Sequence, residues 1–345
     1  MANNPFTLTF GKQPDSYIIR YENTNTIIDT FSNSSLSQTY MIEGIRGSGK
    51  TVLMTAIANS FKESKDWIVV NLNSTLNLMD DFAKRLNDAC ETLPNFFSKG
   101  FNISFTGIGL GVNGNDNLRD EVSVIKNILD VVKKKKKKVL ITIDEVMHDQ
   151  NMRAFASEFQ ILIREDYPIY LLMTGLYENI DRIQNDPALT FLLRSPKISL
   201  EPLSILQIIK KYKDIFGIDD DKSQELAAIT KGYAFAFQAL GALYWEQKDK
   251  PDMNHILNSL DNMLDDFVYK KIWSSCSKRD REILLSIEKD ETEISYICKK
   301  TGIKNESFSR YKERLVKKGL ITSTKYGHIS LTLPRFYEIT KNYQI

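Results

Sequence analysis

Short apolar runs of strand type recur between residues 40 and 200, and stretches with helical spacing separate them. A continuous apolar run bounded by polar turn residues is typical of a strand that is buried on both faces. Strands that alternate with helices predict an α/β fold. The predicted strands are residues 40–42, 67–71, 139–146, 168–173 and 197–200.

The segments between these strands have amphipathic helical periods. An apolar helical run at 52–61 follows the first strand, and two further helices lie between the second and third strands. Their apolar positions are Leu78, Met79, Phe82, Leu86 and Leu93 in one helix, and Val122, Ile125, Leu129 and Val132 in the other. After the fifth strand the pattern is helical as far as residue 273. In that stretch, Ser204 and Gln207 have the spacing of a capping box, and Gly232 predicts a helix end.

Residues 276–345 have a different pattern. A helix at 279–288 precedes two helices at 293–301 and 306–318, which are separated by a turn at Gly302 as in a helix-turn-helix. Two short strands at 321–324 and 328–333 then enclose the tripeptide Lys-Tyr-Gly. This order predicts a winged-helix domain.

Charge is unevenly distributed along the chain. The 345 residues carry a net charge of +2, but residues 276–345 contain 15 Lys and Arg against 9 Asp and Glu. The basic side chains expected to contact duplex DNA are Arg310, Lys312, Arg314, Lys317 and Lys325, the last at the tip of the wing. Because winged helices also dock on proteins, a protein partner is an open alternative.

The cysteines and the apolar stretches indicate the compartment. Cys90, Cys276 and Cys298 are odd in number and have no paired spacing, which predicts reduced thiols. The first residues lack the charged and apolar regions of a signal peptide, and no apolar stretch is long enough to span a bilayer. We therefore expect a cytoplasmic protein without a membrane segment.

The stretch MIEGIRGSGKT at 41–51 matches the pattern G-x-x-x-x-G-K-[ST] between a strand and a helix. Glycine permits a loop whose N–H groups point inward, and the following helix adds the positive end of its dipole. A glycine-rich turn without a ligand is the plainer alternative, which the strand and helix on either side make less favourable. The residues expected to bind ATP are Gly44, Arg46, Gly47, Ser48, Gly49, Lys50 and Thr51.

Three further polar positions follow predicted strands. Asp144 ends the third strand, where it would hold Mg²⁺ together with the Thr51 hydroxyl, and Glu145 would polarise the attacking water. Thr174, after the fourth strand, would contact the γ-phosphate or the water. Arg194, before the fifth strand, would act on the nucleotide of its own chain or of a neighbouring copy in a homo-oligomer. Each assignment has a structural alternative. Asp144 and Glu145 would be solvated acids at a strand end, Thr174 would cap the next helix, and Arg194 would form a surface ion pair. The chain has no N-K-x-D motif, which disfavours a GTPase.

The order of these pieces resembles an AAA+ P-loop ATPase of the branch that contains origin-recognition initiators and STAND ATPases. The stretches that carry the resemblance are NPFTLTFGKQPDSYIIR, GIRGSGKT, ITIDEV, LLMTGL, TFLLRSPKISLEPLS and KGYAFAFQALG.

The resemblance implies an α/β P-loop NTPase fold with a five-stranded parallel sheet and the nucleotide at the carboxyl ends of its strands. It divides the chain into a segment at 1–40 that covers the nucleotide, an ATPase core at 41–200, a helical lid at 201–275 and a winged helix at 276–345. It also implies that Arg20 lies at the adenine. Initiators have an arginine after the lid glycine, whereas Gly232 is followed here by Tyr-Ala-Phe.

Two segments are not explained by this resemblance. The glycine-rich stretch within residues 93–117 predicts a hairpin or a surface loop. The six lysines at 133–138 suit a solvated connection after a helix better than a nucleic-acid patch. We expect a nucleotide-controlled ATPase that acts on DNA. The alternatives are a STAND-like signalling or defence ATPase that docks on protein, and an ATPase subunit that assists an effector or a transposition enzyme.

Overall fold

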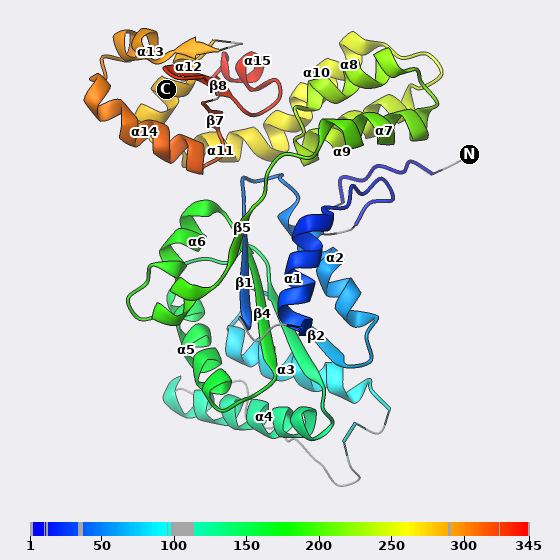
Figure 1. Cartoon of the computed structure of the whole chain (residues 1–345), viewed down its shortest axis with the longest axis vertical. Helices are drawn as coiled ribbons and strands as arrows, with labels where there is room; N and C mark the ends of the chain where they lie inside the picture. Colours follow the sequence, from blue (N-terminus) through cyan, green and yellow to red (C-terminus); the bar gives the residue numbers. More distant parts are fainter. Residues whose placement is uncertain are drawn as a thin grey trace. The chain divides into compact units, whose positions relative to one another are not determined.

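The computed structural model describes residues 3–9, 11, 13–33, 37–94, 96–97, 114–288, 291–323 and 325–343. They form two compact units (Figure 1). The sheet unit contains Arg20–Glu43 and Lys50–Ser199, and the helical unit contains Met1–Ile19, Gly44–Gly49 and Leu200–Ile345. The expected hairpin at 103–112 lies outside the described residues.

The sheet unit contains a five-stranded sheet in the order β2-β3-β4-β1-β5, in which every neighbouring pair is parallel. Its strands are β1 (Thr39–Glu43), β2 (Trp67–Leu72), β3 (Lys138–Ile143), β4 (Ile169–Gly175) and β5 (Lys197–Ser199). The predicted parallel sheet is confirmed. Because β4 lies between β1 and β3, the strand that leads into the glycine-rich loop and the strand that precedes Asp144 are not neighbours.

Helices cover both faces of this sheet (Figure 1). They are α1 (Tyr21–Asn33), α2 (Lys50–Lys62), α3 (Leu78–Glu91), α4 (Gly114–Lys134), α5 (Gln150–Arg164) and α6 (Tyr177–Gln184), followed by the 3₁₀ helix η1 (Thr190–Arg194). Since successive strand residues face opposite sides, Met41 of β1 packs in the core that α3 to α6 cover, whereas Tyr40 contacts Phe31 of α1. Phe31 also contacts Phe61 of α2, so α1 and α2 share the second face.

The lysine run at 133–138 connects α4 to β3, as expected. Among its side chains, Lys137 Nζ donates to Lys65 O and Lys138 Nζ donates to Ser32 O at 3.3 Å, both backbone carbonyls of the sheet unit. Lys138 also lies over the ring of Trp67, 5.1 Å from its centre. These contacts give the two lysines a structural role at this edge of the sheet.

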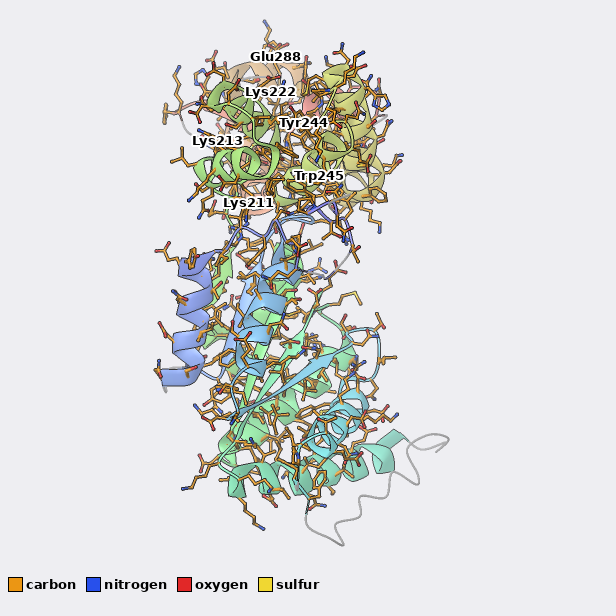
Figure 2. All side chains as sticks on the ribbon, turned by 90° about the vertical axis from the view of Figure 1, so that its right-hand side faces the viewer. Lys211, Lys213, Lys222, Tyr244, Trp245 and Glu288 are labelled. Carbon is orange, nitrogen blue, oxygen red and sulfur yellow. The ribbon has the colours of Figure 1, made fainter. Side chains whose placement is uncertain are left out.

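Residues 205–275 of the helical unit form a series of helices. They are α7 (Ile205–Phe216), α8 (Asp220–Thr230), α9 (Ala234–Glu246), α10 (Met253–Leu264), the π-helical turn η2 (Asp265–Tyr269) and α11 (Lys270–Ser275). On the surface, Lys213 of α7 pairs with Asp220 of α8 at 2.5 Å (Figure 2). Inside, Tyr244 of α9 packs against Phe216 of α7 with ring centres 4.7 Å apart. Ser204 precedes α7 but its side chain makes no capping bond, so the predicted capping box is wrong.

The N-terminal segment packs against these helices. Phe6 lies 5.6 Å from the ring of Phe237, and the backbone N–H of Thr7 donates to Gln238 Oε1 at 3.2 Å. A Cβ at Gly241 of α9 would lie 2.4 Å from the Phe6 ring, so only glycine lets the two approach this closely. Residues near the N-terminus therefore belong to the core of the helical unit.

The C-terminal part contains the three predicted helices and two predicted strands, together with a short strand, β6, and a helix, α15, that were not predicted. They are α12 (Lys278–Ser286), β6 (Thr292–Glu293), α13 (Ile294–Thr301), α14 (Asn305–Lys317), β7 (Ile321–Thr322), β8 (His328–Leu331) and α15 (Phe336–Thr340). The strands form an antiparallel sheet in the order β6-β8-β7. One continuous hydrophobic core joins these elements to α7–α11.

Candidate nucleotide site

The glycine-rich loop lies between β1 and α2, in the strand–loop–helix context that its motif requires. β1 ends at Glu43 and α2 begins at Lys50. Gly47 and Gly49 have φ angles of 79° and 92°, which L-residues rarely adopt, so the curl of the loop depends on these two glycines. The Ser48 N–H donates to Ile45 O at 3.2 Å and closes a turn within the loop. Lys50 is buried, with 7% of its surface exposed.

Four predicted site residues of the sheet unit lie together at the carboxyl ends of its strands. The Thr51 hydroxyl donates to Asp144 Oδ2 at 2.8 Å, and the Thr174 hydroxyl donates to Asp144 Oδ1. The Glu145 N–H donates to Asp144 Oδ1 at 3.0 Å and lies 3.3 Å from Thr174 Oγ1. Thr174 is completely buried, whereas Asp144 is partly exposed and Glu145 is exposed. Residues from three separate segments therefore converge on one carboxylate.

The two predicted arginines, Arg194 and Arg20, belong to other segments of the sheet unit. Arg194 is exposed at the end of η1, three residues before β5 begins. Arg20 is partly buried and directly precedes α1, where its carbonyl accepts the N–H of Thr24 at 2.9 Å. The roles expected of both arginines remain predictions.

Sequence reasoning missed a contact between the glycine-rich loop and the start of α9, both of which belong to the helical unit. The Tyr233 hydroxyl donates to the Arg46 carbonyl at 2.5 Å, and the Phe235 N–H donates to the Gly47 carbonyl at 3.1 Å. Tyr233 is 5% exposed, and burial raises the pKa of its hydroxyl. The aromatic residues after Gly232 indicate burial, but the sequence carries no signal for the loop contact.

Comparison with solved structures shows which fold carries this site. A Walker-type ATPase of Pyrococcus abyssi matches with a TM-score of 0.64 and 13% identity, over 95% of this chain and 96% of that chain. The Aeropyrum pernix ORC2 protein, in its ADPNP–ADP complexes, matches with a TM-score of 0.63 and 12% identity, over 97% of this chain and 96% of that chain. Cdc6p from Pyrobaculum aerophilum matches with a TM-score of 0.52 and 14% identity, over 96% of both chains.

The chain has the fold of an AAA+ P-loop ATPase. At these identities the likeness concerns the fold alone, and it confirms the expected resemblance to origin-recognition ATPases at that level. The model of a domain of unknown function (DUF8462) matches residues 266–338, in the C-terminal part of the helical unit. No curated protein matches the sequence.

Only some of the predicted basic residues of the C-terminal part are exposed in the structure. Arg310 on α14 and Lys325 between β7 and β8 are exposed, and Lys312 is partly exposed. Arg314 instead binds the buried carboxylate of Asp280, with its Nε 3.2 Å from Oδ1. Lys317 pairs with Glu313 at 2.7 Å. The guanidinium of Arg314 is therefore engaged within the domain, which corrects the expectation that it faces DNA.

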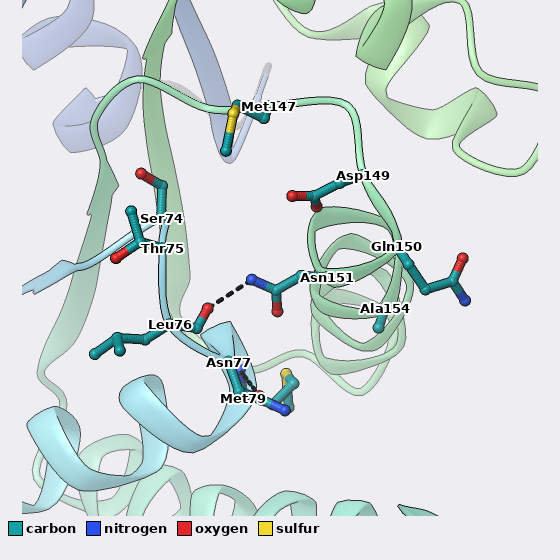
Figure 3. Close-up of a pocket in the computed structure, with 10 residues that line it drawn as sticks. All are labelled: Ser74, Thr75, Leu76, Asn77, Met79, Met147, Asp149, Gln150, Asn151 and Ala154. Carbon is teal, nitrogen blue, oxygen red and sulfur yellow. Dashed lines mark hydrogen bonds between the residues drawn. The ribbon is translucent and has the colours of Figure 1, made fainter.

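A separate pocket of about 620 Å³ lies in the sheet unit at the starts of α3 and α5 (Figure 3). Three of its polar side chains have structural roles: Asn77 caps α3, Asp149 caps α5, and the Asn151 amide donates to Leu76 O at 2.6 Å. Leu76 and Met147 supply apolar surface.

The structure also bears on metal ions and on membranes. Within the described ranges, no group of three or more His, Cys, Asp and Glu side chains is arranged to hold a metal ion. No helix in the described part of the chain combines the length and apolar character needed to cross a membrane.

Proposed function

We propose that this protein binds Mg·ATP and works as a nucleotide-controlled AAA+ ATPase. The observation that carries the proposal is the 2.8 Å hydrogen bond between the hydroxyl of Thr51 and the carboxylate of Asp144. Thr51 directly follows the glycine-rich loop and Asp144 directly follows β3. In P-loop ATPases a hydroxyl and a carboxylate at these two places serve the metal ion beside the phosphates.

The residues present fit a magnesium ion. Octahedral ligands about 2.1 Å from Mg²⁺ are about 3 Å from their neighbours, which is close to the separation of the Thr51 and Asp144 oxygens. Mg²⁺ also needs few protein ligands, because waters and phosphate oxygens complete its shell. When bound, it would neutralise charge on the β- and γ-phosphates. Lys50 at the start of α2 would add a positive charge next to them.

Hydrolysis is a further part of the proposal. Glu145 is exposed next to Asp144, and its carboxylate would orient the attacking water. The Thr174 hydroxyl already donates to Asp144, and it would sense the occupancy of the metal site through that bond. Arg194 would stabilise charge that develops during phosphoryl transfer, since a guanidinium binds phosphate oxygens in bidentate fashion.

We further propose that the C-terminal part binds duplex DNA through the exposed cations Arg310, Lys312 and Lys325. A second candidate partner is a protein effector. It is favoured by the pairing of Arg314 with Asp280 and by the exposed rings on the same part of the chain. Those rings belong to Tyr296, which is 43% exposed, and Tyr326, which is fully exposed.

ATP binding is tested with Lys50→Ala. Lys50 contributes a point charge in a loop otherwise made of backbone, so the variant should lose ATP binding in calorimetry while its thermal unfolding stays close to wild type. Lys62→Ala, at the exposed end of the same helix, is the matched control. Equal ATP affinity of Lys50→Ala and wild type would reject the site.

DNA binding is tested by fluorescence anisotropy at several salt concentrations. Binding through phosphate contacts should weaken steeply as salt rises. Arg310→Ala should lower the affinity and reduce the salt dependence, whereas Glu306→Ala on the same helix should not lower it. A stable protein partner that survives nuclease treatment, together with no DNA affinity, would select the second candidate.

A further inference from the structure

Two carbonyl groups of the glycine-rich loop accept hydrogen bonds from the start of α9. Tyr233 Oη donates to Arg46 O at 2.5 Å, and the Phe235 N–H donates to Gly47 O at 3.1 Å. An anion-binding loop presents its N–H groups to the ligand, and its carbonyls carry partial negative charge that opposes binding. The two carbonyls bound by α9 are therefore held where they do not face an anion.

Peptide geometry extends this argument to a particular donor. No peptide bond among the described residues is cis, and a trans peptide group carries its C=O and N–H on opposite sides. Because the carbonyl of Arg46 is bound to Tyr233, the N–H of Gly47 in the same peptide group is directed away from Tyr233. The contact thus fixes the direction of one of the loop's own donors.

Tyr233 and Phe235 pack closely against the loop at Gly47. A Cβ built on Gly47 would lie 2.1 Å from the Tyr233 hydroxyl oxygen and 3.2 Å from the Phe235 Cβ. The ring of Tyr233 is held in turn by Tyr269, whose own hydroxyl donates to Pro334 O at 2.7 Å. The hydroxyl of Tyr233 therefore has little freedom to find another acceptor. Since burial raises its pKa, it remains a donor over the physiological range.

We infer that Tyr233 is a positioning residue for ATP, and that it acts by holding the Arg46 carbonyl so that the glycine-rich loop keeps its anion-binding form. Tyr233 works through the loop and does not touch the nucleotide. The coupling is reciprocal, because a ligand that favours one form of the loop also favours the contact that this form makes. Bound ATP therefore strengthens the attachment of the loop to α9. This inference rests on the proposed ATP binding.

The test compares Tyr233→Phe with Tyr212→Phe in the full-length protein. Both tyrosines are buried in the helical unit and donate to a backbone carbonyl, but Tyr212 donates to Phe237 O at 2.8 Å and not to the loop. Loss of the Tyr233 hydroxyl removes this donor to the Arg46 carbonyl, so the ATP affinity measured by calorimetry should fall about tenfold. The affinity of Tyr212→Phe should stay within about twofold of wild type, because that hydroxyl acts on packing alone.

Hydrogen exchange supplies the readout that a general loss of packing would not produce. Without nucleotide, Tyr233→Phe should exchange faster at the amides of 44–49 and at Phe235, with α7 and α8 unchanged, and ATP should restore less protection than in wild type. Equal ATP affinity in Tyr233→Phe and wild type would overturn the inference. Equal losses in both variants would also overturn it, because the effect would then be one of packing. If wild type binds no ATP, the proposed function itself fails.

Discussion

Glu145 has a backbone conformation that is unusual for its residue type. Its φ of 50° lies in the left-handed region, which costs an L-residue about 1–2 kcal/mol. Its N–H donates to Asp144 Oδ1 and lies near the Thr174 hydroxyl, so the neighbouring site residues hold it in this form. Backbone strain of this kind is often found at functional sites. Here the backbone conformation of Glu145 sets the direction in which its side chain projects.

We predict that Glu145→Gln retains Mg·ATP binding and loses turnover. The Glu145 N–H makes the two contacts with Asp144 and Thr174, and glutamine keeps this N–H. Glutamine has the size of glutamate but cannot accept a proton, and loss of a general base typically costs a factor of about 100 to 10,000 in rate. Steady-state phosphate release and ATP calorimetry measure the two effects separately.

Glu165→Gln, which changes an exposed carboxylate of the same unit, is the control and should turn over ATP like wild type. If wild type itself shows no turnover above background with DNA and candidate partners, the protein is a binding switch. Glu145 then has no catalytic role.

A second titratable residue, Glu121 on α4, predicts a pH dependence of stability. Glu121 Oε2 and Asp80 Oδ1 are buried and have no hydrogen-bond partner among the described residues. Burial, together with the charge of Asp80, raises the pKa of Glu121 to about 7, while Lys84 opposes the shift. The folded protein therefore keeps this proton at pH values where the unfolded chain has lost it.

As the pH rises from about 4.5 to 7, the unfolded chain releases the Glu121 proton first, so the free energy of unfolding falls until both states are deprotonated. Glu121→Gln should therefore raise the free energy of unfolding at pH 8 by about 2 kcal/mol, and by much less at pH 5. Thermal unfolding at the two pH values measures the difference. Glu91→Gln, on an exposed residue of α3, should show no such difference. A gain that is equal at both pH values would show that the effect is not one of titration.

At the level of single residues, the sequence predicts the site residues whose role depends on a local motif or on the end of a strand. The glycine spacing defines the loop that ends at Lys50 and Thr51. Parallel strands end at a common edge, which brings Asp144 and Thr174 together. Tyr233 could not be predicted, because its partner Arg46 lies 187 positions away in the sequence. An aromatic residue in an apolar stretch indicates burial but not its acceptor.

Helix α14 shows how one element combines exposed and internal cations. Arg310 is exposed, whereas Arg314, one helical turn later, binds Asp280 of α12. Asp280 is only 1% exposed, and it also forms the capping box of α12 with Ser277. The ion pair therefore joins the start of α12 to the end of α14.

We predict that the replacement of these two arginines changes the free energy of unfolding by very different amounts. Arg314→Ala leaves a buried carboxylate without its partner and should lower the free energy of unfolding by about 3 kcal/mol. Arg310→Ala removes an exposed charge and should change it by less than about 0.5 kcal/mol. Chemical denaturation measures both. A stable Arg314→Ala variant would show that the Asp280 ion pair is not structural, and would return Arg314 to the candidate DNA contacts.

At the level of elements, the strands could be predicted to within a few residues because their apolar runs are continuous. Helix α1 was not predicted. Its sequence YENTNTIIDTFSN is mostly polar, and only Ile27 and Phe31 are buried in it. A helix that packs through one short stripe has a weak periodic signal. The capping box expected at Ser204 is absent, whereas Ser277 and Asp280 form one.

At the scale of the whole chain, the compact units do not follow the order of the sequence. The glycine-rich loop at Gly44–Gly49 belongs to the helical unit, although β1 and α2 on either side belong to the sheet unit. The contacts of Tyr233 and Phe235 with the loop carbonyls are part of the reason. Such contacts join positions far apart in the sequence, so a linear division at 1–40, 41–200, 201–275 and 276–345 could not anticipate them.

The last prediction concerns Arg194, and it separates a cooperating oligomer from a self-contained switch. Arg194 is exposed, and the structure shows no hydrogen bond or ion pair for it among the described residues. If it completes the site of a neighbouring copy, turnover per subunit should rise with protein concentration. A Lys50→Ala subunit, which cannot bind ATP but keeps Arg194, should then restore turnover when mixed with Arg194→Ala subunits.

If Arg194 instead contacts the nucleotide of its own chain, Arg194→Ala should weaken ATP retention in a monomer, and mixing should restore nothing. Arg182→Ala, on α6 of the same unit, controls for the general loss of a positive charge. Turnover of the mixture, measured together with the molecular mass in the presence of ATP, decides between the two arrangements. A monomer with bound ATP and no restoration by mixing would exclude action on a neighbour, because an exposed guanidinium can reach a second active site only within an assembly.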